Sequence, residues 1–227
     1  MNILLKKCRE AIKANLIPGL LLQALALAIV IGYYQVPYVH QLCEQLSELK
    51  LRHGKLFAGI STSLAGGVIP VAFLILTKRI PRHRAVQNAL FYTIFWLWKG
   101  VEIDVFYAYQ AQWFGDDPTF KAISLKVLVD QFIWNPIYAA PCIALVYFWR
   151  DCSFSFRRFK KELSRDMFFV KIPTLLVSTW MVWIPMCAII YSLPTTLQVP
   201  LFNVVLCFFV LLVNIICDEK TLEEDLA

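Results

Sequence analysis

Charged residues are scarce in this chain, and their scarcity decides its class. Only 17% of its 227 residues are Asp, Glu, Lys or Arg, whereas 59% are hydrophobic. Soluble domains carry about 25% charged residues, and about half of their residues are apolar. The composition therefore excludes an ordinary soluble domain and predicts a polytopic membrane protein.

The sequence also lacks the short motifs that mark metal sites and common active sites. Its seven cysteines form no C-x-x-C pair, and neither His40 nor His53 has the spacing of a metal ligand. No G-x-S-x-G turn, phosphate-binding loop or dinucleotide glycine pattern occurs. Glu102 and Asp104 lie about 200° apart on a helix, which does not suit paired acid–base work. We expect no enzyme, no metal and no cofactor, and unusual membrane chemistry stays open as a third hypothesis.

The net charge of +6 comes from short basic clusters that flank apolar runs. One cluster runs from Lys78 to Arg84, and the other runs from Arg150 to Lys171 with seven basic residues against three acids. This distribution orients membrane spans and is not that of a nucleic-acid surface. Both clusters also suit anionic lipids, which is compatible with orientation. The expected partner is the lipid bilayer, with no nucleic acid.

Six apolar runs are each about long enough to cross a bilayer, which takes about 20 residues. They cover 16–38, 56–77, 88–110, 123–149, 172–193 and 199–217. The predicted fold is all-α, a single polytopic transmembrane helix bundle of about six spans. Small residues at 61–67 predict a face that another helix approaches closely.

The single membrane domain 1–227 has three parts. They are an extra N-terminal span with an amphipathic helix at 1–55, the main helix bundle at 56–217, and an acidic tail at 218–227. The amphipathic helix is predicted at 40–55 from the helical spacing of Val39, Leu42, Leu46 and Leu49. The basic stretch 1–15 is either a surface helix or the charged flank of the first span.

The basic turns predict how the spans are oriented. If both turns and the N-terminus are cytoplasmic, an even number of spans returns the tail to the cytoplasm. The third span is the uncertain one, because Lys99, Glu102 and Asp104 lie near its middle. Either these charges line a polar interior, or the span only reaches the interface with Lys99 directed to water. In the second case five spans remain and the tail changes sides.

The candidate functional residues are polar groups inside the third and fourth spans. They are Lys99, Glu102, Asp104, Tyr107, Lys126, Asp130, Gln131 and Asn135. An ionised side chain inside a bilayer costs a few kcal/mol, so it normally faces other helices or a water-filled cavity. We therefore expect the fourth span to pack against the third, with Asp130 sharing charge with Lys99 or Lys126.

The fourth span also carries a family resemblance. Lys126, Asp130, Gln131 and Pro136 match the K-x-x-x-D-Q-x-x-x-x-P signature of the Mpv-seventeen and PMP-twenty-two family of small membrane proteins of peroxisomes and mitochondria. The chain resembles this family mainly over 100–136.

Other blocks of the family are only partly present. Gly100, Phe106 and Tyr107 follow its G-P-x-x-H-x-W-Y register, with Val101 and Asp104 in place of the proline and histidine. A looser match to its tryptophan-proline block involves Trp180, Trp183, Pro185 and Pro194. The sequence is therefore similar to the family as a divergent relative.

Two functions follow as hypotheses. The first is a channel-like protein whose polar residues line a hydrated interior route, where the acids attract cations: Glu102, Asp104, Asp130, Gln131 and Asn135. The resemblance implies a solute-permeant role. The alternative is a structural or interaction protein, because polar residues between membrane helices also hold helices together. The extra first span and the lack of an Arg- and Ser-rich transit peptide favour a bacterial-type inner membrane. In a eukaryote, the resemblance implies a mitochondrial or peroxisomal membrane.

Overall fold

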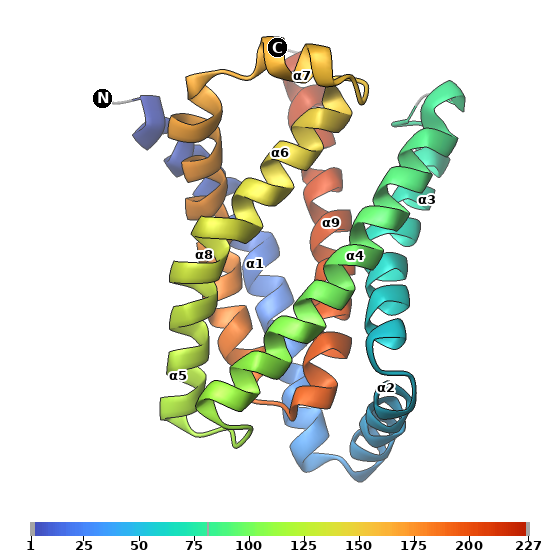
Figure 1. The fold of residues 1–227 in the computed structure, drawn as a ribbon, viewed down its shortest axis with the longest axis vertical. Helices are drawn as coiled ribbons and strands as arrows, with labels where there is room; N and C mark the ends of the chain where they lie inside the picture. Colours follow the sequence, from blue (N-terminus) through green and yellow to red (C-terminus); the bar gives the residue numbers. More distant parts are fainter. Residues whose placement is uncertain (1–2, 81, 226–227) are drawn as a thin grey trace.

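The computed structural model describes residues 3–80 and 82–225, and every regular element in these ranges is a helix. Figure 1 shows the long helices side by side in one bundle. The elements are α1 (Ile3–Gln35), α2 (Pro37–Ser63), η1 (Leu64–Val68), α3 (Ile69–Leu76), α4 (Arg82–Phe114), α5 (Phe120–Val129), η2 (Asp130–Ala139), α6 (Ala140–Asp151), α7 (Phe156–Glu162), η3 (Met167–Lys171), α8 (Ile172–Tyr191) and α9 (Thr195–Asp225). The all-α class is confirmed.

Four helical stretches in the described part are long and apolar enough to cross a membrane. They are Asn15–Gln35, Pro37–Leu76, Phe120–Asp151 and Met167–Tyr191. Helix α9 contributes a shorter apolar stretch, Thr195–Leu211, and α4 carries Lys99, Glu102 and Asp104 within its length. The membrane class is thus supported by four helices, and the count of six spans stays a prediction.

The helix ends and connections are divided between the two ends of the bundle. Helix α1 begins and α9 finishes at the upper end in Figure 1, where the α3–α4 connection and α7 also lie. The α1–α2, α4–α5 and α8–α9 connections lie at the lower end. Both basic clusters of the sequence therefore fall at one end, together with the basic start of α1.

Three π-helical segments widen the bundle helices, and a proline follows each of them. The segments η1, η2 and η3 precede Pro70, Pro141 and Pro173, which occupy the first turns of α3, α6 and α8. A proline ring clashes with the carbonyl four residues earlier and donates no N–H, and a widened turn relieves that clash. Segment η2 thereby resets the direction in which Asp130 and the residues after it point.

Small residues let α2 and η1 approach α4 closely, as the sequence predicts. A Cβ on Gly66 would lie 2.6 Å from the Trp96 ring, and one on Gly67 would lie 2.9 Å from the Tyr92 carbonyl oxygen. The Ser63 hydroxyl donates to the Thr93 carbonyl across the same contact at 2.8 Å. Helix α4 is therefore fixed against α2 and η1 by backbone proximity.

The predicted amphipathic helix forms the first half of α2. It ends at Gly54, whose φ of 53° and ψ of −126° turn the chain, a conformation that glycine adopts at little cost. Ser47 faces the bundle and donates to the Thr196 hydroxyl at 2.7 Å. Leu42, Leu46 and Leu49 are instead 42% exposed each, so the apolar face points away from the bundle.

Both chain ends continue the helices next to them, which agrees with the basic stretch as the flank of the first span. Helix α1 runs without a break from Ile3 to Gln35, so most of the basic stretch extends the first span. Helix α9 continues to Asp225, and most of the acidic tail prolongs the last helix. Cooperative propagation explains both, because extending an existing helix avoids the cost of nucleation.

Candidate functional site in the bundle interior

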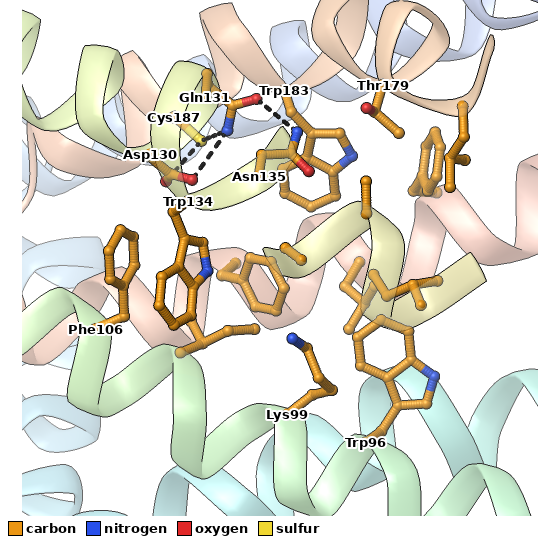
Figure 2. Close-up of a pocket in the computed structure, with 18 of the residues that line it drawn as sticks. Trp96, Lys99, Phe106, Asp130, Gln131, Trp134, Asn135, Thr179, Trp183 and Cys187 are labelled. Atoms are coloured by element: carbon orange, nitrogen blue, oxygen red, sulfur yellow. Dashed lines mark hydrogen bonds between the residues drawn. The ribbon is translucent and has the colours of Figure 1, made fainter. Parts of the chain in front are cut away.

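A cavity of ≈ 270 Å³ lies among α4, the η2–α6 segment, α8 and α9. Figure 2 shows its walls, which are mostly aromatic and aliphatic. The aromatic residues that line it are Trp96, Phe106, Tyr107, Trp134, Tyr147, Trp183, Phe202 and Phe209. Trp134 stacks on Phe106 with ring centres 4.4 Å apart, which closes the wall between η2 and α4. The site is thus a mainly apolar, partly open cavity between these helices, called the chamber below.

A few polar groups reach this chamber from three helices. Segment η2 supplies Asp130, Gln131 and Asn135, α4 supplies Lys99, and α8 contributes Cys187. Figure 2 shows Asp130, Gln131 and Asn135 on one side, with Lys99 rising from α4 on the opposite side. A mostly apolar cavity with a few polar groups is the usual composition of a small-molecule site.

Three side chains donate to the buried Asp130 carboxylate. The Tyr191 hydroxyl donates to Oδ2 at 2.6 Å, and the Cys187 thiol lies 3.5 Å from the same oxygen. The Gln131 amide donates to Oδ1 at 3.2 Å. A carboxylate offers about four acceptor positions, so about one stays open on Oδ1. These partners hold the carboxylate in place at the chamber wall.

Gln131 connects this carboxylate to the rest of η2 and to α8. Its Oε1 accepts from Asn135 Nδ2 at 3.3 Å, and its backbone carbonyl accepts from Trp180 Nε1 at 2.9 Å. The Trp180 bond satisfies a carbonyl within the π-helical segment, where the backbone hydrogen-bond pattern departs from that of an α-helix. Gln131 is therefore fixed from both its side chain and its backbone.

A buried polar chain runs from Asp130 toward the lower end of the bundle. Gln110 Nε2 donates to the Tyr191 hydroxyl at 3.3 Å and to the Lys126 carbonyl at 3.0 Å. Lys126 is 1% exposed, and its ammonium lies 5.8 Å from the centre of the Tyr191 ring. Asp130, Tyr191, Gln110 and Lys126 thus form one continuous group between α4, α5, η2 and α8.

Lys99 and Glu102 form a second, separate pair on α4. The Lys99 ammonium donates to Glu102 Oε1, and the Tyr138 hydroxyl donates to Glu102 Oε2 at 2.7 Å. The side chains of Lys99 and Glu102 are only 3% and 10% exposed. The same ammonium lies 5.2 Å from the centre of the Tyr138 ring. Both charges of this pair are therefore compensated within the bundle.

The structure brings together only part of the candidate set. Lys99, Tyr107, Asp130, Gln131 and Asn135 line the chamber. The others lie beside it or away from it: Glu102 behind Lys99, Lys126 at the end of the polar chain, and Asp104 in an ion pair of 2.7 Å with Lys50 of α2. Asp130 is thus the one acid among the eight candidates that lines the chamber.

The partners of Asp130 differ from the expected lysines. In the described part of the chain, the ion pair of Lys99 is with Glu102, and Asp130 takes the donors Tyr191, Cys187 and Gln131 instead. Lys99 and Glu102 are three residues apart on one helix, which favours local pairing. Lys126 precedes Asp130 by four residues, which is the weaker order for an intrahelical pair.

Sequence reasoning missed Gln110, Cys187 and Tyr191, which complete the polar group. Gln110 ends one apolar run and Tyr191 lies near the end of another, where a polar residue usually marks the interface, and Cys187 has the pattern of a small hydrophobe. Among the described residues, no group of three His, Cys, Asp or Glu residues is placed to hold a metal ion.

No family model, no curated protein and no solved structure matches this chain.

Proposed function

We propose that this protein is an integral membrane protein whose interior chamber admits a small solute and passes it across the bilayer, with a preference for cations over anions. The observation that carries the proposal is the chamber itself, where the Asp130 carboxylate faces space that packing leaves unfilled. A negative group in a low-dielectric wall attracts cations. The family resemblance, which remains a prediction, agrees with a solute-permeant role.

The buried polar chain supports one half of a route. Gln110 and Lys126 continue from Asp130 and Tyr191 toward the α4–α5 connection at the lower end. Buried polar groups in membrane helices characteristically mark the paths of ions and protons. A solute at the chamber would meet polar groups on its way to that end.

The structural alternative explains the hydrogen bonds but not the chamber. The Thr62 hydroxyl of α2, for example, donates to Asn203 Oδ1 of α9 at 2.7 Å, and neither residue lines the chamber. Modest polar contacts of this kind suffice for helix association. Helix packing alone does not require a cavity of this size beside a carboxylate.

Six spans with both ends in the cytoplasm are the topology that we propose. Helix α4 has 33 residues, about 50 Å of helix, which exceeds the hydrocarbon thickness. Its three charges have partners in Lys99–Glu102 and Lys50–Asp104, which lowers the cost of placing them in the bilayer. The basic end would face the cytoplasm and its anionic lipids, in a bacterial-type inner membrane or an organelle membrane.

Cysteine labelling tests this topology. In a variant without native cysteines, Arg84→Cys and Arg158→Cys should react with an impermeant maleimide from the cytoplasmic side only. Asp117→Cys, in the exposed α4–α5 connection, should react from the opposite side only. The reason is that Arg84 belongs to the first turn of α4 and Arg158 to α7, both at the basic end of the bundle, whereas the α4–α5 connection lies at the other end. Labelling of Arg84→Cys and Arg158→Cys from opposite sides contradicts six spans.

Conductance of the purified protein in liposomes tests the function. In a potassium chloride gradient, the reversal potential of the wild type should show cations passing faster than chloride. Asp130→Asn keeps the side-chain shape and removes the charge, and it should lower the cation-over-anion ratio about tenfold. Ala139→Leu, which places a larger side chain in the chamber wall, should reduce total conductance and leave the ratio nearly unchanged.

Asp104→Asn is the matched control, because Asp104 pairs with Lys50 and does not line the chamber. It should leave the ratio at the wild-type value. Two results would favour the structural alternative: wild-type conductance no higher than that of empty liposomes, or a ratio that Asp130→Asn does not change.

A further inference from the structure

We infer that the chamber is a binding site for a small organic ammonium ion with an apolar, preferably aromatic, body. This inference deepens the proposed function, because it names the class of solute that the same chamber holds. It rests on the charge balance of the lining, on the open acceptor of Asp130, on the aromatic walls and on the volume.

The charge balance of the lining is negative. Two of the lining side chains carry charge, Lys99 and Asp130. Lys99 is already neutralised by Glu102 within the same helix. Asp130 has hydrogen-bond donors but, within the described residues, no cation at ion-pair distance. Among the charges that line the chamber, the one without an ion-pair partner is therefore the Asp130 carboxylate, which favours a cationic ligand. The buried Lys126 ammonium, 5.8 Å from the centre of the Tyr191 ring, lies outside the lining.

The carboxylate is also positioned to receive such a ligand. Tyr191 and Cys187 both lie against Oδ2, whereas Gln131 is the sole donor to Oδ1. Oδ1 thus keeps an open side, against which a quaternary ammonium can lie by charge attraction and to which a protonated amine can also donate. Because three side chains already fix the carboxylate, binding requires little rearrangement of the protein, and this lowers the entropic cost of association.

The walls favour an organic cation over a metal ion. Trp134, Trp183 and Trp96 line the chamber together with five further aromatic residues, and aromatic faces attract cations, indole most strongly. They offer few oxygen atoms to replace the water shell of a strongly hydrated ion such as magnesium, which requires oxygen ligands. A substituted ammonium ion presents apolar surface to these rings together with the positive charge that their faces attract.

The volume restricts the ligand to a small molecule. A space of ≈ 270 Å³ lies just below the usual range of drug-sized sites. It is too small to enclose a lipid with two acyl chains or a folded peptide. A single aromatic ring with a substituted ammonium group is the class of ligand that matches both the volume and the lining.

Equilibrium dialysis of the purified full-length protein in detergent micelles, corrected for micelles alone, tests the inference. The probes are benzyltrimethylammonium, its neutral carbon isostere neopentylbenzene, and the anion benzenesulfonate. The wild type should bind benzyltrimethylammonium at least about tenfold more tightly than either of the other probes, because only the cation gains the carboxylate. Equal binding of cation and isostere overturns the inference.

Two variants locate the site. Asp130→Asn should weaken benzyltrimethylammonium binding about tenfold and leave neopentylbenzene binding within about twofold, because the cavity persists without its charge. Retained neopentylbenzene binding also reports that the variant is folded. Asp104→Asn should leave both affinities unchanged. An equal loss in Asp104→Asn and Asp130→Asn overturns the assignment of the site.

If Asp130→Asn also fails to bind neopentylbenzene, the variant Ala139→Leu decides whether the probes bind in the chamber. It should weaken cation and isostere alike by narrowing the chamber, and unchanged binding of both places the ligand elsewhere and overturns the inference. Binding without conductance in liposomes would leave the inference standing and remove the proposed function. Conductance without selective binding of the ammonium probe would do the opposite.

Discussion

Glu102→Gln should destabilise the folded bundle by about 3 kcal/mol, one of the two largest effects that the structure predicts. The substitution removes the charge that compensates Lys99, whose side chain is 3% exposed and cannot reach water without rearrangement. An uncompensated ammonium inside a bundle is costly because the surrounding helices provide little solvation. The free energy of unfolding in mixed detergent micelles measures the effect.

The double variant Lys99→Met and Glu102→Gln separates charge from shape. It removes both charges, and Tyr138 retains an acceptor in the new amide oxygen. Replacing a buried ion pair with groups of similar volume is often nearly neutral, so stability should return to within about 1 kcal/mol of the wild type. Glu48→Gln, at an exposed position on α2, is the control and should change stability by less than about 0.5 kcal/mol. A double variant as unstable as the single one would show that the charge pair is not the cause.

This pair also illustrates how far the sequence determines the site. The spacing of Lys99 and Glu102 predicts that they meet on one helix face, and they do. The pairing of Asp104 with Lys50 is not readable from either helix alone, because it depends on where Gly54 turns the first half of α2. Local spacing therefore predicts contacts within a helix. It does not predict contacts between helices whose relative position depends on a turn elsewhere in the chain.

The donors of Asp130 were unpredictable for a related reason. They come from α8 and from η2, and their position depends on how far the widened turns rotate each helix. The prolines at 70, 141 and 173 carry a signal for these turns, because each one requires a relieved carbonyl four residues earlier. Hydropathy gives the extent of the apolar helices but not their rotation about their own axes, and rotation decides which side chains share the chamber.

Two of the three acids in the third and fourth spans are paired with lysines in the fold. Three acids within the third and fourth spans indicate a strongly negative interior, yet Glu102 and Asp104 each have a lysine. Only Asp130 keeps its charge for the chamber. The cation preference that we propose therefore depends on one carboxylate, and it should be sensitive to a single substitution.

Gly100→Ala is the second large effect, and it tests the close contact of α4 with α2. A methyl group at this position would lie 2.5 Å from the Ala58 carbonyl oxygen and 2.6 Å from Thr62 Cβ. The oxygen belongs to a helix backbone and cannot move aside as a side chain does, so the helices must separate. Overpacking of this kind costs about 3 kcal/mol, and the higher helix propensity of alanine returns about 1 kcal/mol. The expected loss in unfolding free energy is about 2 kcal/mol.

Gly59→Ala on the facing helix is the matched substitution. Its methyl group would meet Val101 Cγ2 at 3.1 Å and the Leu97 carbonyl oxygen at 3.3 Å, distances that a shift of a few tenths of an ångström relieves. The gain in helix propensity should offset this strain, so the net change should stay below about 1 kcal/mol. Because α4 carries Lys99 and Tyr107 to the chamber, separation of the helices by Gly100→Ala should also weaken chamber binding, whereas Gly59→Ala should preserve it. Equal stability of the two variants would contradict the close backbone contact at Gly100.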